Sequence, residues 1–182
     1  MLAAGTFVAD DEPTPVPTPT PADCSIVGVG DAEYILGYDV EGPDQISREG
    51  GICYFSSSDF SHEGRVSYAI VTPQDLPRRR AFYYAFSRRC APAAKGTFNE
   101  LACRQFLKLA AAQTIDDYYA ARTGSGDASP VPGLGASAVV SGNALYLRRG
   151  QKVFEISVTR DGEFDLARSR QLATLLLTRI PR

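Results

Sequence analysis

The sequence predicts an α+β domain in which helices pack on an antiparallel sheet of about five strands. Two observations lead to this prediction. Short segments of alternating apolar and polar residues occur in two groups, and segments with helical spacing and capping residues lie between and around them. The expected order is helix, two strands, two helices, three strands, helix. Hairpin-linked strands with helices grouped between them are typical of the α+β class.

In the first part of the domain, the sequence predicts one short helix followed by two strands. A helix over Asp31–Leu36 ends at Gly37, a residue suited to a left-handed helix cap. Strands are expected at Ile52–Ser57 and Arg65–Val71, and in the second of them Val66, Tyr68 and Ile70 recur at every second position and share one face.

Two helices are expected next. Thr72–Asp75 combines a capping threonine, a proline at the first helical position and an acidic residue in the first turn, so it starts a helix that runs to about Arg89. Thr97 and Glu100 have the spacing of a capping box and start a second helix that runs to about Arg122.

After a Gly/Pro/Ser-rich loop at 124–135, residues 138–158 have the pattern of a three-stranded meander, and this pattern also tests the register of its strands. If Gly142-Asn143 and Gly150-Gln151 are two-residue turns, one face of the meander is entirely apolar. A slip of one residue would destroy that agreement. The face consists of Ala138, Val140, Leu145, Leu147, Phe154, Ile156 and Val158. A last helix is expected over 164–179.

The chain divides into residues 1–23, a signal remnant and Pro/Thr-rich linker, and residues 24–182, a single domain. Residues 13–22 read PTPVPTPTPA, which favours an extended polyproline II spacer. Residues 1–9 are mildly apolar, as the tail of a signal peptide would be, but a terminus without structure explains them equally well.

The four cysteines predict two disulfides and therefore an extracytoplasmic location. Cys90 and Cys103 flank the linker between two expected helices and form a local clip, which leaves Cys24 to pair with Cys53. Four buried thiols in a cytosolic protein are the alternative. Because the cysteines are not clustered and His62 is the single histidine, no metal site is expected.

Composition excludes several classes of partner. With 19 basic and 21 acidic residues the net charge is −2, so no nucleic-acid partner is expected. The arginines of 78–80 and 88–89 are expected on the solvent side of their helix. No apolar run reaches the roughly 18 residues of a membrane span. We expect a monomer. No cofactor is expected, since the Gly28–Glu33 segment lacks the third glycine of a dinucleotide loop.

The sequence favours a non-enzymatic binding domain for an envelope protein or a small ligand. The second face of the meander carries Tyr146, Arg148 and Glu155, a mixed and partly exposed set that we take as the possible contact face. No catalytic residue is assigned. The alternative is a small secreted hydrolase that uses the Ser56–His62 loop, where serine, aspartate and histidine occur together.

Three fragments carry a family resemblance: Cys24 followed by Leu36-Gly37, then Cys53-Tyr54-Phe55, then the VPGLGASA segment at 131–138. Together they resemble small secreted proteins and lipoproteins of unknown function from actinobacteria and similar bacteria. Related domains resemble sensor ectodomains of envelope receptor kinases or the PsbP-like α-β-α sandwich. The resemblance implies a Cys24–Cys53 pair and allows a ligand-sensing accessory domain, but it supplies no catalytic residue.

Overall fold

A computed structural model describes residues 23–46, 51–58, 62–90, 98–124, 126–134 and 137–180. Its helices are α1 (Val29–Leu36), α2 (Leu76–Ser87), α3 (Phe98–Ala111), α4 (Ile115–Thr123) and α5 (Leu166–Arg179), with short 3₁₀ turns η1 (Pro73–Asp75) and η2 (Arg88–Cys90). Its strands are β1 (Val40–Ile46), β2 (Ile52–Ser57), β3 (Gly64–Val71), β4 (Ser129–Pro130), β5 (Ala138–Ser141), β6 (Ala144–Arg149), β7 (Lys152–Arg160) and β8 (Glu163–Phe164).

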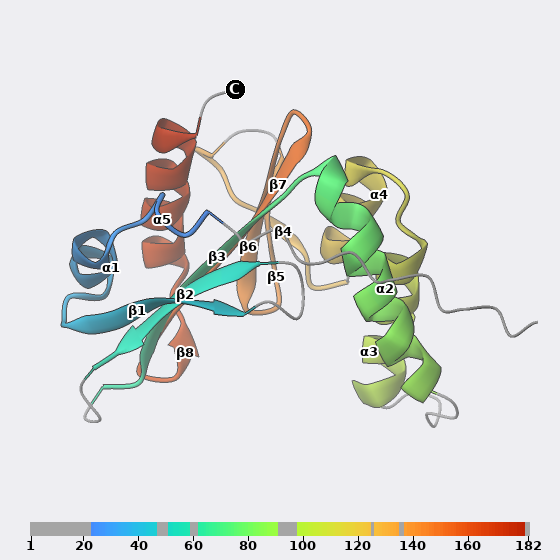
Figure 1. The fold of residues 1–182 in the computed structure, drawn as a ribbon, viewed down its shortest axis with the longest axis horizontal. Helices are drawn as coiled ribbons and strands as arrows, with labels where there is room; N and C mark the ends of the chain where they lie inside the picture. Colours follow the sequence, from blue (N-terminus) through green and yellow to red (C-terminus); the bar gives the residue numbers. More distant parts are fainter. Residues whose placement is uncertain are drawn as a thin grey trace, which may run out of the picture.

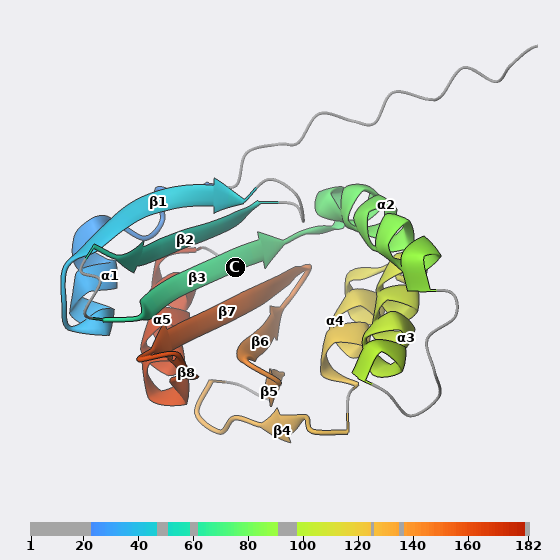
Figure 2. The same ribbon diagram turned by 90° about the horizontal axis from the view of Figure 1, so that it is seen from below.

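The strands form one antiparallel sheet in the order β1-β2-β3-β7-β6-β5-β4, and β8 pairs with β7 beside this path. The long pairing of β3 with β7 joins the two groups of strands that are separate in the sequence. Helices α1 and α5 lie on one side of the sheet, and α2, α3 and α4 form a second group at its other end (Figures 1 and 2). The α+β class predicted from the sequence is confirmed.

The predicted register of the meander is also confirmed. Leu145 lies opposite Ile156, and Leu147 lies opposite Phe154. Gly142 and Gly150 have φ values of 56° and 57°, the left-handed conformation that two-residue hairpin turns require at that position.

The expected number of five strands is wrong, because β1, β4 and β8 were not recognised. Strand β1 contains Gly42 and Pro43, residues that ordinarily mark a turn. The register between β1 and β2 shifts between Glu41 and Asp44, and such a bulge accommodates a proline that has no N–H to donate. Strands β4 and β8 have two residues each, too few for an alternating pattern.

The long helix expected up to Arg122 is two helices, α3 and α4. The chain breaks before Ile115, where the N–H of Asp117 donates to Thr114 Oγ1 at 3.1 Å and the N–H of Thr114 donates to Asp117 Oδ2 at 3.0 Å. This reciprocal cap starts α4. The Thr97 cap expected for the preceding helix lies outside the described residues.

Two groups of buried residues pack on the sheet. The first lies beneath α1 and α5 and contains the apolar meander face, including Leu145, Phe154 and Ile156, against Leu172 and Leu176. The second lies beneath α2, α3 and α4 and includes Val71, Leu76, Tyr83, Leu109, Ile115, Tyr118 and Val153. Since neighbouring residues of a strand point to opposite faces, Val153 and Phe154 of β7 serve different groups.

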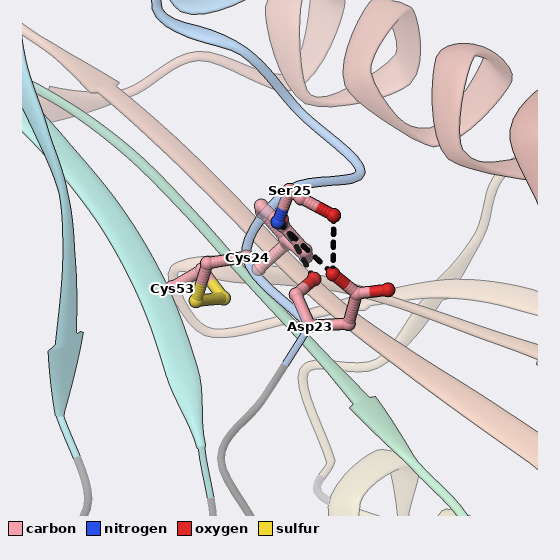
Figure 3. The surroundings of a disulfide bond; sticks show 5 residues. Asp23, Cys24, Ser25 and Cys53 are labelled. Atoms are coloured by element: carbon pink, nitrogen blue, oxygen red, sulfur yellow. Dashed lines mark hydrogen bonds between the residues drawn. A yellow bond between two sulfur atoms is a disulfide. The ribbon is translucent and has the colours of Figure 1, made fainter.

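Both expected disulfides are present. Cys24 and Cys53 have Cα atoms 5.5 Å apart, and those of Cys90 and Cys103 are 5.6 Å apart. Figure 3 shows the first bond beside a local turn in which the N–H and hydroxyl of Ser25 donate to Asp23 Oδ1 at 3.1 and 2.5 Å. Two disulfides point to an oxidising, extracytoplasmic environment. Within the described ranges, no helix combines the length and hydrophobicity of a membrane span.

The Cys24–Cys53 bond closes a separation of 29 residues. We expect the double variant Cys24→Ser/Cys53→Ser to lower the free energy of unfolding by about 2–4 kcal/mol, because its unfolded chain gains conformational freedom. Urea unfolding measures this change. Thiol titration of the unreduced, denatured wild-type protein should find no free thiol, and four free thiols would contradict both bonds.

Phe154 is fully buried in the group beneath α1 and α5. Phe154→Ala should lower the free energy of unfolding by about 3–5 kcal/mol, since the substitution leaves a cavity that the sheet and α5 cannot close. Urea unfolding tests this, with Leu101→Ala as a control on the exposed side of α3. A loss below about 1 kcal/mol for Phe154→Ala would show that the site collapses without cost.

Candidate functional site

A buried ion-pair cluster lies between the sheet and helices α2 and α4. Its carboxylate is Glu155 of β7, which binds two arginines at once. Arg79 Nη1 of α2 lies 2.9 Å from Glu155 Oε2, and Arg122 Nε of α4 lies 2.8 Å from Glu155 Oε1. The Arg79 side chain is fully buried, while those of Glu155 and Arg122 are 11% and 14% exposed.

Tyrosines complete the cluster. The Tyr118 hydroxyl donates to Glu155 Oε1 at 2.7 Å and accepts from Arg79 Nη1 at 2.6 Å. Arg122 donates from Nη2 to the Tyr83 hydroxyl. The Arg122 guanidinium also lies 5.2 Å from the ring centre of Tyr83, 5.5 Å from that of Tyr118 and 5.9 Å from that of Tyr146. These distances are within the range of cation–π attraction.

Charge, rather than burial, sets the protonation of the cluster. Burial would raise the pKa of Glu155, but the two guanidinium groups of Arg122 and Arg79 outweigh it and lower the pKa to about 2. Burial raises the pKa of the Tyr118 hydroxyl well above its ordinary value. Glu155 is therefore ionised at neutral pH, and the two arginines with one carboxylate carry a net charge of +1.

Local spacing explains how the cluster forms. Arg79 lies three residues after Leu76 and four before Tyr83, so it shares the buried face of α2 with them. Tyr118 and Arg122 are four residues apart on α4 and lie on one face in the same way. The sequence predicts the arginines of 78–80 on the solvent side of their helix. For Arg79 this is wrong, and its spacing from two buried residues was the available signal.

A groove of about 830 Å³ lies beside this cluster, lined by residues of α3, the end of α4 and the β5–β6 hairpin. Arg122 belongs to the cluster and also lines the groove, as does Tyr146, whose ring lies beside the Arg122 guanidinium. The volume falls in the range of sites for small molecules. Its apolar lining consists of Leu101, Ala102, Ala121, Ala144 and Tyr146.

Charged side chains line the same groove. Arg104 of α3 pairs with Glu100 on the preceding turn, and Lys108 lies one turn further along. Lys108 forms no ion pair with any residue that the structure describes. The carboxylate of Asp127 lies on the other side, where its Oδ2 accepts the N–H of Gly142 at 3.0 Å.

The expected contact face is more buried than the sequence suggested. Tyr146 is 8% exposed, and Glu155 pairs with Arg79 and Arg122. The expected partial exposure is therefore wrong for Tyr146 and Glu155, because α2 and α4 cover this end of the face. Arg148 is 35% exposed and pairs with Asp116 at 2.7 Å rather than with Glu155. Of the three predicted residues, Tyr146 reaches the groove.

The Ser56–His62 loop is described at its two ends only, since residues 59–61 lie outside the described ranges. The His62 ring stacks on Tyr38 at 5.0 Å with an interplanar angle of 9°. Its Nδ1 lies 3.9 Å from Asp161 Oδ1. Among described residues the structure shows no hydrogen bond between His62 and a serine, which a nucleophile and its base would share. The hydrolase that uses this loop stays an untested alternative.

Comparisons with protein families, with curated proteins and with solved structures found no match for this chain. The resemblance to small secreted proteins and lipoproteins of actinobacteria therefore stays a prediction. In the described part of the chain, no group of three or more His, Cys, Asp or Glu side chains is arranged to hold a metal ion.

Glu155→Gln should destabilise the protein strongly, because it leaves Arg79 and Arg122 buried without a counter-charge. We expect a loss of about 3–5 kcal/mol at pH 7 in urea unfolding. The matched control is Glu163→Gln on β8, where the carboxylate is exposed. A loss equal to that of the control would contradict the described ion pairs.

The same variant should change the acid dependence of stability. Because the pKa of Glu155 is lowered from 4.5 to about 2 on folding, its contribution is complete above pH 4.5 and is lost as the pH falls toward 2. Glu155→Gln should therefore have a flatter stability profile in this window than the wild type. Profiles of equal slope would argue against an ionised Glu155 in the folded protein.

Proposed function

We propose that this chain is an extracytoplasmic, non-enzymatic domain that binds a small molecule with an apolar body in the groove between α3, α4 and the β5–β6 hairpin. The observation that supports this proposal is the combination of an apolar lining with polar and charged groups, which lie on the α3 wall, at Arg122 and at Asp127. Small-molecule sites in proteins have this composition, in which apolar walls supply affinity and a few polar groups fix orientation.

The position of the groove also supports a binding role. Its floor includes Arg122 and Tyr146, which are held by the ion-pair cluster, so part of the site is organised before a ligand arrives. One wall is α3, which the Cys90–Cys103 disulfide ties to the turn after α2. A preorganised site loses less conformational entropy on binding.

The two other functions expected from the sequence have less support. A hydrolase would need His62 to contact a nucleophile, and its described partners are Tyr38 and Asp161. An accessory domain of an envelope receptor would be a use of the same binding site, and it rests on the family resemblance. We therefore choose ligand binding without a catalytic step, by a monomer and without a cofactor.

The test uses N-phenyl-1-naphthylamine, a neutral apolar dye whose fluorescence rises in an apolar site. We expect saturable binding of one dye per chain to the full-length protein. Ala102→Trp should weaken it by about tenfold or more, since an indole would occupy groove space beside Ala102.

Ala111→Trp is the control, because Ala111 is exposed at the end of the same helix and does not line the groove. It should bind the dye as the wild type does. Thermal midpoints of both variants are measured to confirm that they fold. Absence of saturable binding, or equal binding by a folded Ala102→Trp variant, would refute the groove as the site.

A further inference from the structure

We propose that the ligand of this groove carries an anionic group, a carboxylate or a sulfonate, which binds Arg122 at the floor while the apolar body lies against Leu101 and Ala102. This inference rests on the proposed function, since it names the chemical class of the molecule that the groove binds. The occupant is a small soluble amphipathic anion. Three features of the structure support it.

The first feature is the charge of the ion-pair cluster. Glu155 is shared by Arg79 and Arg122, so one carboxylate faces two guanidinium groups and a positive charge remains. Arg79 is completely buried and lies away from the groove lining, whereas Arg122 is part of it. The excess positive charge therefore reaches the groove at Arg122. Because this guanidinium is largely shielded from water, its attraction for an anion is stronger than it would be on an exposed surface.

The second feature is a donor that the cluster does not use. Arg122 donates from Nε to Tyr118 at 3.2 Å and pairs through the same atom with Glu155, and it donates from Nη2 to Tyr83. For Nη1 the structure shows no hydrogen bond to any described residue. A guanidinium held on two sides by tyrosines presents its remaining N–H groups in a fixed direction. Such groups bind carboxylates and similar anions well.

The third feature is the sign of the other groups in the groove. Arg104 and Lys108 lie one turn apart on the wall formed by α3, and Lys108 has no described ion-pair partner. The carboxylate that lines the groove is that of Asp127, and it accepts the N–H of Gly142. Among the lining residues three cations, Arg104, Lys108 and Arg122, therefore stand against the carboxylate of Asp127, so an anion complements the site better than a cation does.

The experiment compares two dyes that differ by one charged group. The compound 8-anilino-1-naphthalenesulfonate is N-phenyl-1-naphthylamine with an added sulfonate. Fluorescence titration of the full-length protein should give a Kd about tenfold lower for the sulfonate than for the neutral dye, because the sulfonate gains charge-assisted hydrogen bonds.

Variants locate the charge preference. The double variant Arg104→Gln/Lys108→Gln should weaken binding of the sulfonate by roughly fivefold more than it weakens binding of the neutral dye. The control is Arg65→Gln/Arg170→Gln, which removes two exposed cations that do not line the groove and changes net charge equally. The control should bind both dyes as the wild type does.

Outcomes separate this inference from the proposed function. If the neutral dye binds and the sulfonate binds no tighter, the anion preference is refuted while the groove remains a binding site. If both double variants weaken the sulfonate equally, net charge rather than the groove attracts it, and the inference is refuted. Sulfonate binding that persists in Ala102→Trp would place the anion elsewhere and also refute the inference. If neither dye binds to wild type, the proposed function itself fails.

Discussion

The shared carboxylate of Glu155 is the constraint on which the arrangement of this domain depends. It lies on β7, near the middle of the sheet, and its two partners come from α2 and α4. A charge at this depth is tolerated because opposite charges and a tyrosine hydroxyl surround it. Helices α2 and α4 can therefore pack on the sheet only where Arg79 and Arg122 both reach one side chain. The position of the groove follows from that restriction.

The two buried groups of the domain have different chemistry. The one beneath α1 and α5 is almost entirely aliphatic and aromatic, and side chains such as Phe154 and Leu172 determine its stability through contact area. The one beneath α2–α4 combines apolar residues with the charge cluster and borders the groove. Apolar packing stabilises the sheet on the face beneath α1 and α5. On the other face polar groups are fixed in position, as a binding site requires.

The sequence could predict those elements whose pattern is repeated locally. The meander was predictable because Leu145 and Leu147 lie opposite Ile156 and Phe154 of β7, so that apolar residues had to meet apolar residues on one face. Strand β1 was not, because Gly42 and Pro43 carry the local signal of a turn and only pairing with β2 makes them part of a strand. The break before α4 had a visible cap at Thr114, which the continuous helical spacing around it obscured.

The candidate site was less predictable, for a physical reason. The sequence shows a mixed strand face that carries Tyr146, Arg148 and Glu155. Such a face is compatible with exposure to water, and equally with burial beneath a helix that carries polar side chains. Which of the two occurs depends on Arg79 and Arg122, whose distances in sequence from Glu155 are large. Helical spacing could mark Arg79 as buried, but nothing local identifies its partner. Buried ion pairs of this kind become visible only when the fold brings the elements together.

The two edge strands of the sheet, β1 and β4, limit association between chains. Strand β1 ends the path on one side and contains Pro43, and β4 ends it on the other with two residues, one of which is Pro130. A proline has no N–H to offer a neighbouring strand, and a bulge or a very short strand presents few aligned groups. Both borders of the sheet are thus poor templates for strand addition, so the extended β3–β7 centre is shielded from the edge-to-edge pairing that leads to aggregation.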